Sequence, residues 1–164
     1  VPIFQKYYSF ISGNQEIVGL EYKSDLLNGN ILDLLAGSRV ADRAAQHTTV
    51  GIHRDDLGFM IGERNIKKTA SQGQQKTYLV SLKLAQFELI KETMKKKPLL
   101  LLDDVFDKLD ADRVERIISL VADDNFGQIF ITDANKIRID KLLENVTSEY
   151  RIFSVTDGVV SLFE

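Results

Sequence analysis

The hydrophobic pattern is clearest in the second half of the chain, where helical and strand-like segments alternate. Between residues 71 and 97 the apolar positions form a wide stripe at helical spacing without a proline, which predicts one long, largely buried helix. Lys95 to Lys97 are expected to close this helix by complementing the negative end of its dipole, and Pro98 to stop it. The apolar run from Leu99 to Leu102 is typical of a strand buried on both faces.

The residues that follow complete a βαβ unit. Apolar positions recur at i, i+3, i+4 and i+7, which predicts a crossover helix. These positions are Val114, Ile117, Ile118 and Val121. A second apolar strand is predicted over Gln128 to Thr132, so the two strands should be parallel with a right-handed crossover. Two short β runs around Asp157-Gly158 predict a hairpin at the C-terminal end.

The first part of the chain is more weakly patterned and predicts a smaller, mixed α+β segment. In chain order we expect a helix over 2–11, a strand over 17–23, an amphipathic helix over 30–46, and β structure from residue 48 that includes a hairpin of 57–61 and 65–67. The fold class is therefore α/β, with a parallel βαβ core, a C-terminal β-hairpin and this N-terminal segment.

Composition narrows the class of protein. The length of 164 residues favours one domain, and the absence of cysteine excludes disulfides, thiolate zinc sites and cysteine nucleophiles. A net charge of −3 gives no global attraction to nucleic acid. No apolar run is long enough for a membrane span, and the N-terminus lacks the pattern of a signal peptide, so we expect a cytoplasmic protein. The sequence begins with Val1 rather than with Met, so we expect it to be a fragment of a longer protein.

Two adjacent carboxylates, Asp103 and Asp104, follow the first strand of the βαβ unit. Ligands of open α/β sheets bind beyond the carboxyl ends of parallel strands. Two carboxylates there suit a divalent cation and a base that activates water. The alternative is that the pair merely ends a strand and begins a loop.

Two further segments could carry chemistry. The sequence Ser71-Gln72-Gly73-Gln74 opens the long helix, where it fits a capping box and also an anion site made of a hydroxyl, a glycine and free N–H groups. The segment Asp107-Lys108-Leu109-Asp110 precedes the crossover helix, and Asp110 is a credible N-cap for it.

The order of these motifs resembles the distal half of an ABC-type ATPase of the ABC/SMC superfamily. Ser71 to Gln74 resembles the signature sequence, LLLLDD the Walker B strand with its following acid, and Lys108 to Asp110 the D-loop. Within that superfamily the chain resembles the RecF recombination-mediator family. The segments that carry this resemblance are GIHRDDL (51–57), ASQGQQKT (70–77), SLKLAQFELIKE (81–92) and LLLLDDVFDKLD (99–110).

The resemblance implies a role for each motif residue. Asp103 would hold the Mg²⁺ of ATP, and Asp104, where ABC ATPases usually have Glu, would polarise the attacking water in a slow hydrolysis. The signature residues would contact the γ-phosphate of a nucleotide held mainly by a second subunit, with Asp110 at the same dimer seam. These signature residues are Ser71, Gly73 and Gln74.

The resemblance also implies a division of the chain and a set of partners. Residues 1–47 would end a helical or mixed second lobe, and residues 48–164 would form the distal half of the ATPase lobe. The family dimerises with ATP on double-stranded DNA near gaps and single-strand junctions, and it works with the RecR and RecO mediators to help load the recombinase RecA. The resemblance therefore also implies that the protein is associated with the nucleoid in the cytoplasm.

Two departures from the ABC pattern limit what the chain does alone. The sequence contains no G-x-x-x-x-G-K-[ST] loop, so we expect the chain alone neither to bind ATP tightly nor to hydrolyse it. Asp133 stands where most ABC ATPases carry a switch histidine. His53 is interpreted as a hydrogen-bonded structural residue, because no other histidine lies at ligand spacing.

Alternative functions remain open at this point. A metal-dependent phosphodiesterase would use Asp103, Asp104 and Asp107 to hold two cations. A non-catalytic interaction module would use the same motifs only as structural caps. Half of a transporter ATPase is disfavoured by the missing switch histidine.

Overall fold

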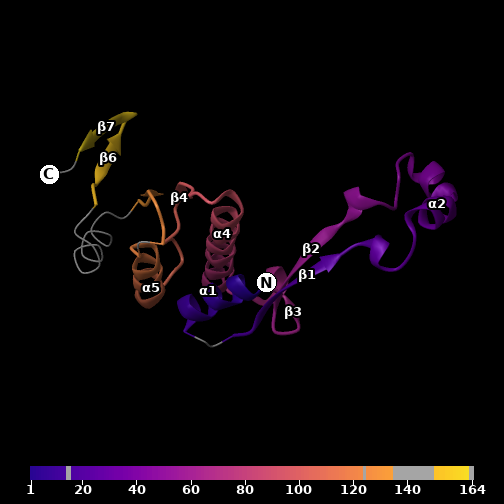
Figure 1. The fold of residues 1–164 in the computed structure, drawn as a ribbon, viewed down its shortest axis with the longest axis horizontal. Coiled ribbons are helices and arrows are strands. Elements are labelled where there is room, and N and C mark those ends of the chain that lie inside the picture. The colour runs from indigo at the N-terminus through magenta and orange to yellow at the C-terminus, as the bar shows by residue number, and fades with distance from the viewer. Residues whose placement is uncertain (14–15, 124, 135–149, 163–164) are drawn as a thin grey trace.

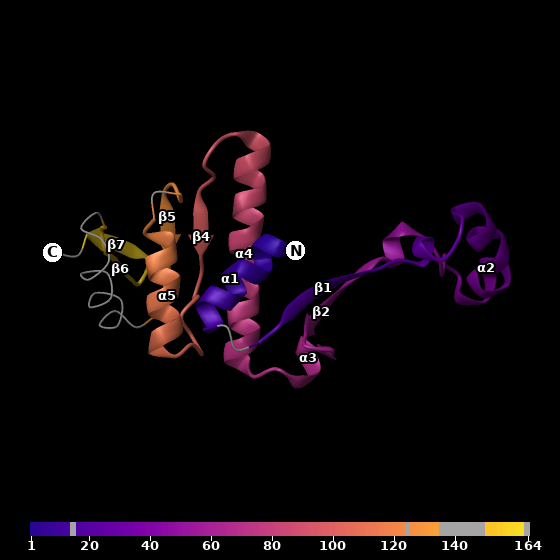
Figure 2. The same ribbon diagram turned by 60° about the horizontal axis from the view of Figure 1, so that its bottom comes forward.

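The computed structural model describes residues 1–13, 16–123, 125–134 and 150–162. Figures 1 and 2 show a layered α/β body from which a two-stranded arm projects. The elements in chain order are α1 (Pro2–Ser12), β1 (Val18–Lys23), the 3-10 helix η1 (Asp25–Leu27), α2 (Ile31–Ala45), the 3-10 helix η2 (Ile52–Arg54), β2 (Asp56–Ile61), β3 (Arg64–Asn65), α3 (Ile66–Thr69), α4 (Gln72–Met94), β4 (Leu100–Leu102), α5 (Ala111–Val121), β5 (Ile129–Ile131), β6 (Phe153–Thr156) and β7 (Val159–Leu162).

The body confirms the predicted parallel βαβ unit. Strands β4 and β5 are parallel neighbours, with Leu100 opposite Ile129 and Leu102 opposite Ile131, and α5 lies between them in the chain. The four apolar residues that predicted the crossover helix are all buried in the core. Helix α1 packs across α4, and the hydroxyl of Tyr7 donates to Glu88 at 3.0 Å.

Helix α4 is long, as predicted, but it is not largely buried. Buried positions such as Leu84 and Phe87 lie on one side, whereas Leu89 is 60% exposed. The helix also ends before Lys95, whose φ of 54° is left-handed, so the three lysines lie beyond the last turn and Pro98 does not stop the helix directly. The apolar residues of α4 lie on several sides of the helix, but the rest of the body covers only one side, so the others remain exposed.

Strand β4 is buried on one face only, which corrects the prediction for Leu99 to Leu102. Leu100 and Leu102 are buried, but Leu101 is 63% exposed. In the part of the chain that the structure describes, β5 is the only strand paired with β4. Leu101 lies on the face of β4 opposite to Leu100 and Leu102, and this face stays exposed.

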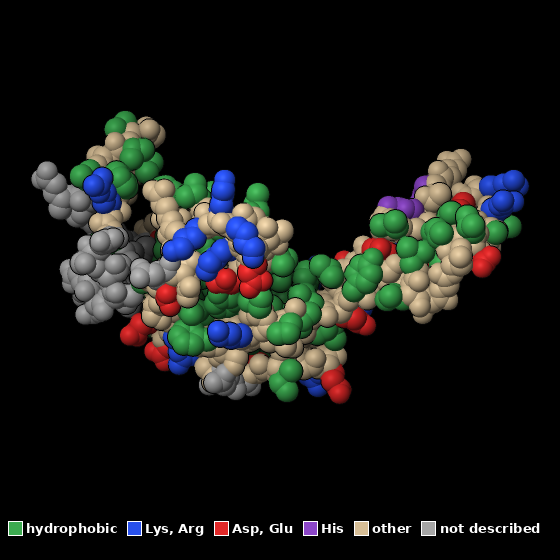
Figure 3. Space-filling view, viewed as in Figure 1, with side chains coloured by type: hydrophobic (Ala, Val, Ile, Leu, Met, Phe, Trp, Pro, Cys, Tyr) green, Lys and Arg blue, Asp and Glu red, His purple; other side chains and the backbone are tan. Residues whose placement is uncertain are grey.

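The arm is a ribbon of two antiparallel strands with α2 at its tip (Figure 1). Strands β1 and β2 pair over six positions, from Val18 opposite Ile61 to Lys23 opposite Asp56. Helix α2 forms where predicted, and the side chain of Asn30 accepts from the N–H of Leu32 to cap it. None of its residues is buried, and Figure 3 shows apolar side chains at the surface of the arm and its tip.

Two predictions for the segment from residue 48 are wrong in detail. Residues 48–50 form no strand, and residues 52–54 form a 3-10 helix, so the β structure starts at Asp56. The predicted hairpin is present, but its return strand β3 holds two residues and Lys67 lies in α3. The side chain of Asn65 caps α3 by accepting from the N–H of Lys67, which ends the strand early.

The C-terminal hairpin is confirmed for the residues described. Strands β6 and β7 pair around Asp157 and Gly158, both with positive φ, as a tight hairpin turn requires. Phe163 and Glu164 of the predicted hairpin lie outside the described residues.

Among the described residues, no helix combines the length and apolar character needed to cross a membrane. The division at residues 47 and 48 stays a prediction, and β1 and β2 on its two sides form one ribbon.

Candidate functional site

Asp103 and Asp104 follow β4 and are bonded to the end of the neighbouring strand β5. The hydroxyl of Thr132 donates to Oδ1 of Asp103 at 2.5 Å and accepts from the backbone N–H of Asp104 at 3.0 Å. The N–H of Thr132 in turn donates to the carbonyl of Leu102 at 2.9 Å. Both aspartates are exposed. The end of β5 therefore orients Asp103 while both carboxylates remain accessible.

The backbone at Asp104 is left-handed, with a φ of 47°. Few non-glycine residues adopt this conformation, and aspartate and asparagine do so more often than most. The chain thus turns sharply directly after Asp103, and the turn is fixed by the two bonds that the N–H of Asp104 makes to Thr132.

The N-terminus of α4 forms the predicted capping box. The hydroxyl of Ser71 accepts from the N–H of Gln74 at 3.2 Å, and Oε1 of Gln74 accepts from the N–H of Ser71 at 2.7 Å. Both residues therefore have a structural role at the helix terminus, whatever they bind in addition.

The amide group of Gln74 has a second partner. Its Nε2 donates to the carboxylate of Glu16, which also accepts from the hydroxyl of Tyr8. Burial raises the pKa of Tyr8 well above its ordinary value of 10, and the hydrogen bond to Glu16 raises it further. Tyr8 therefore remains a neutral donor at physiological pH, and Glu16 links α1 to the start of α4.

Gly73 brings the signature segment against the D-loop. A Cβ at Gly73 would lie 3.0 Å from the carbonyl oxygen of Lys108 and 3.2 Å from Nη1 of Arg113. Such a contact is too close for most side chains, so glycine permits the approach of the two segments.

Asp110 is the N-cap of α5, as predicted, because its Oδ1 accepts from the N–H of Arg113 at 2.9 Å. Its Oδ2 also lies 3.4 Å from Nε of Arg113. The guanidinium of Arg113 therefore lies between the D-loop aspartate and Gly73, and its side chain is only 16% exposed. This arrangement brings Gly73 and Asp110 of the predicted site together.

The signature segment and the D-loop lie at one end of the body. In Figure 2 α4 and α5 both begin at the lower end of the layers, and the chain runs from β4 down to this end before α5. Within the described residues, no hydrogen bond or ion pair joins the two aspartates after β4 to the signature residues. The predicted site residues thus form two groups, Asp103 and Asp104 with Thr132, and the signature residues with the D-loop.

Three residues around the predicted site were missed by sequence reasoning. Thr132 carries a detectable signal, since it is a polar residue at the carboxyl end of an apolar strand beside β4. Arg113 is one of several basic residues in a helix, and Glu16 lies 58 positions from Gln74, so neither stands out by spacing.

The described residues contain no group of three acidic or histidine side chains able to hold a metal ion. Asp107 lies 3.4 Å from Nζ of Lys108 and is not part of a cluster with Asp103 and Asp104. The three-carboxylate arrangement of the phosphodiesterase alternative is therefore not present. Asp103 alone, with an exposed carboxylate held by Thr132, still fits a hard cation whose other ligands come from phosphate and water.

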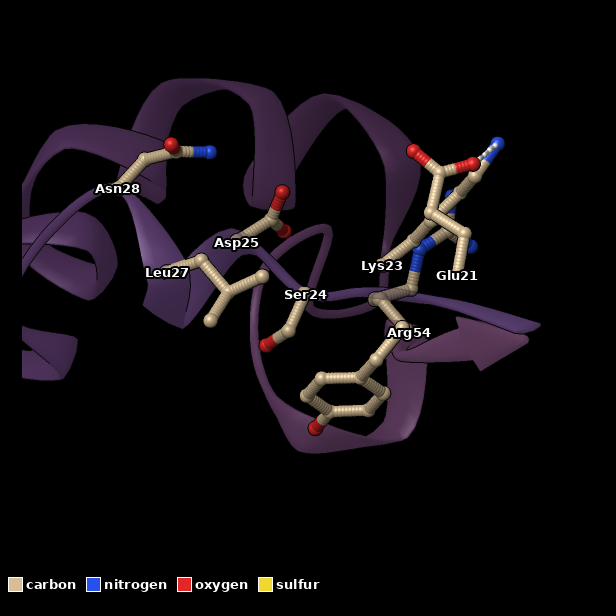
Figure 4. A pocket seen from close by; sticks show the side chains of 8 residues that line it. Glu21, Lys23, Ser24, Asp25, Leu27, Asn28 and Arg54 are labelled. Atoms are coloured by element: carbon tan, nitrogen blue, oxygen red, sulfur yellow. Dashed lines mark ion pairs between the residues drawn. The ribbon is translucent and has the colours of Figure 1, made fainter. Parts of the chain in front are cut away.

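Two open pockets lie elsewhere on the described chain. One, of about 350 Å³, lies in the arm and is lined mostly by charged and polar side chains from the segment 21–28, together with Arg54 (Figure 4). The other, of about 480 Å³, lies between the root of the arm and α4, and both Glu16 and Gln74 line it. Neither is lined by Asp103 or Asp104.

His53 and Asp133 both have interaction partners. The Nε2 atom of His53 lies 3.0 Å from the carbonyl of Thr48 and 3.2 Å from its hydroxyl, which confirms a structural, hydrogen-bonded histidine. Asp133 follows Thr132 at the end of β5 and also has an interaction partner.

Comparison with known proteins gives consistent relatives along the whole chain. The DNA replication and repair protein RecF of Bacteroides thetaiotaomicron is 53% identical over 161 residues, which are 98% of this chain and 44% of the relative. RecF of Bacteroides fragilis is 52% identical over the full chain, again 44% of the relative. The chain therefore spans less than half the length of these relatives. No protein-family model matches the chain.

Solved structures agree with this result. The structure of the recombination mediator protein RecF with ATP has a TM-score of 0.72 at 25% identity, over 99% of this chain and 43% of that protein. An SMC ATPase has a TM-score of 0.57 at 14% identity over 99% of this chain, which shows a shared ABC-type ATPase head fold alone. The chain belongs to the RecF family, it has the head fold that the SMC ATPases share, and its motifs are consistent with the C-terminal portion of a RecF protein.

Proposed function

We propose that this chain supplies the signature, Walker B and D-loop segments of a RecF-type ATPase that forms an ATP-dependent homodimer on DNA. The dimer acts at gaps and single-strand junctions in replication and recombinational repair, where it works with RecR- and RecO-type mediators to help load the RecA recombinase. The chain alone is inactive, because it has no phosphate-binding Walker A loop.

One observation carries this proposal. Gly73 of the signature segment lies against the carbonyl of Lys108 in the D-loop, with Arg113 bridging toward Asp110. Two segments that would face a nucleotide across a dimer are therefore held together as one surface. Because that surface lacks its own phosphate loop, it suits a nucleotide delivered by a second subunit.

Each site residue has a role in this proposal. Ser71, Gly73 and Gln74 offer a hydroxyl and the N-terminus of α4 to the γ-phosphate, which a helix N-terminus favours. Asp103 binds the Mg²⁺ that accompanies ATP, and Asp104 orients the attacking water. When Mg²⁺ is bound, it would neutralise part of the negative charge of the ATP phosphates. ATP that binds the dimer better than the monomer shifts the population toward the dimer.

The proposal is tested with the full-length protein that carries this chain. Light scattering during size-exclusion chromatography should show a dimer with ATP and Mg²⁺ and a monomer without them. Asp104→Asn should keep the dimer and lose hydrolysis, whereas Asp103→Asn should weaken both. An ATPase activity in the purified 164-residue chain that Asp104→Asn abolishes would overturn the proposal.

The alternative of a non-catalytic interaction module is supported by the caps that Ser71 and Asp110 make. The two functions are compatible in geometry and differ in their response to nucleotide. A full-length protein whose association is unaffected by ATP would favour the interaction module.

A further inference from the structure

Glu16 belongs to none of the motifs, yet its carboxylate is bonded to the signature segment. One oxygen accepts from Nε2 of Gln74 and the other accepts from the hydroxyl of Tyr8, a residue with no exposed surface. Oε1 of Gln74 meanwhile accepts from the N–H of Ser71. A chain of three hydrogen bonds therefore runs from the buried hydroxyl of Tyr8 to the backbone of Ser71.

Glu16 also lies at the root of the arm, two residues before β1. The hydroxyl of Tyr78 in α4 donates to the carbonyl of Gly19 at 2.6 Å, and Nε2 of Gln5 in α1 donates to the carbonyl of Val18 at 2.9 Å. The N–H of Gly62 at the end of β2 donates to the carbonyl of Ile17 at 2.7 Å. The segment that contains Glu16 thus connects both strands of the arm to helices α1 and α4 of the body.

The space around the Glu16–Gln74 contact is open. The pocket of about 480 Å³ that both residues line extends to Ile61 and Arg64 of the arm root. Packing therefore does not lock the two side chains together, and the hydrogen bond itself sets their relative position. A displacement of the arm root would therefore act directly on this bond.

We propose that Glu16 is a positioning residue for the signature segment, which couples the position of the arm to the end of α4 that faces the nucleotide. This inference rests on the proposed function, because it assigns a regulator to the same site. When the bond is intact, the side chain of Gln74 is held in its capping orientation. When the arm root moves, Gln74 is released and the N-terminus of α4 loses part of its cap.

The chemistry of the pair allows a swap experiment. In Gln74→Glu two carboxylates face each other, so the link should break. In the double variant Glu16→Gln with Gln74→Glu, the new amide oxygen at position 16 can accept from Tyr8 and the amide nitrogen can donate to residue 74. The carboxylate at residue 74 can still accept from the N–H of Ser71, so all three hydrogen bonds are restored.

The first measurement is hydrogen exchange of the peptide covering residues 70–77 in the full-length protein without nucleotide. We expect exchange about tenfold faster in Glu16→Ala and in Gln74→Glu, and a return to the wild-type rate in the double variant. Glu63→Ala removes the same kind of side chain from the exposed turn between β2 and β3 and should leave exchange unchanged. Uniformly faster exchange over the whole chain, or no rescue in the double variant, would overturn the proposal.

The second measurement is the ATP concentration at which half of the protein is dimeric. Glu16→Ala should raise it about tenfold, the double variant should return it to the wild-type value, and Glu63→Ala should leave it unchanged. An unchanged ATP dependence in Glu16→Ala overturns the coupling to nucleotide. Failure of the wild-type protein to dimerise with ATP defeats the proposed function, while the exchange experiment reports separately on the Glu16–Gln74 bond.

Discussion

The hydroxyl of Thr132 lies 2.5 Å from Oδ1 of Asp103, which joins the ends of β4 and β5 through side chains as well as backbone. We expect Thr132→Val, which is nearly isosteric but lacks the hydroxyl, to lower the ATPase rate of the full-length protein about tenfold, because Asp103 loses its orienting bond. The free energy of unfolding should fall by only about 1 kcal/mol. Thr132→Ser keeps the hydroxyl and serves as the control in steady-state kinetics. An unchanged rate in Thr132→Val would contradict a positioning role.

Two glycine-to-alanine substitutions should have opposite effects on stability. Gly73→Ala places a methyl group against the carbonyl of Lys108 and the guanidinium of Arg113, so it should cost about 1–2 kcal/mol and displace the D-loop. Gly37→Ala in α2 meets nothing within 4 Å and should stabilise its helix by up to about 1 kcal/mol. Denaturant unfolding of both variants measures the two changes in the free energy of unfolding. Equal gains in stability would show that the D-loop moves away from a side chain at residue 73 without cost.

Substitutions at Ser71 separate capping from nucleotide binding. Ser71→Asp should keep the stability of the chain, because aspartate caps helices as well as serine does. It should nevertheless weaken ATP-dependent dimerisation at least about tenfold, because a carboxylate repels the γ-phosphate. Ser71→Ala should lose about 1 kcal/mol of stability through the missing cap. ATP-dependent dimerisation that is normal in Ser71→Asp would mean that Ser71 has a structural role alone.

Asp42 makes the tip of the arm sensitive to acid. Its carboxylate accepts from the hydroxyl and the N–H of Thr49, both at 2.7 Å, and these bonds lower the pKa of Asp42 below its ordinary value of 3.8. The unfolded state therefore binds a proton more readily than the folded state. The stability that the Asp42 carboxylate gives to the arm tip is complete above about pH 4 and is lost as the pH falls through the lowered pKa.

The protection factor of the Thr49 amide, which is the intrinsic exchange rate divided by the observed rate at the same pH, measures this loss at the arm tip when it is followed by NMR from about pH 5 to about pH 2. Asp42→Asn should remove the pH dependence in that range. A Thr49 amide whose protection is the same at both ends of the range would show that the carboxylate does not hold this segment.

Regular periodicity explains which elements could be predicted. Helix α5 is indicated by apolar residues that all prove to be buried, and the α4 capping box is visible in Ser71 and Gln74. The prediction that Leu101 is buried is wrong, because a run of apolar residues indicates what a strand can cover and not which partners are present.

Long-range pairing explains what could not be predicted. The N-terminal strand β1 is expected from its pattern, but nothing in the sequence indicates that it pairs with β2 across the intervening α2. The contacts of Gln74 with Glu16 and of Thr132 with Asp103 likewise join residues far apart in the chain. Such contacts depend on the folded arrangement, so local patterns carry no trace of them.

The left-handed backbone at Asp104 also bears on which acid stands there. Aspartate tolerates this conformation better than glutamate, because its short side chain can bond to nearby backbone groups. A glutamate would extend one methylene further toward a nucleotide but would strain the turn by about 1 kcal/mol or more. The residue at this position is therefore a compromise between the reach of the carboxylate and the conformation of the main chain, and the shorter acid is the one this turn accepts.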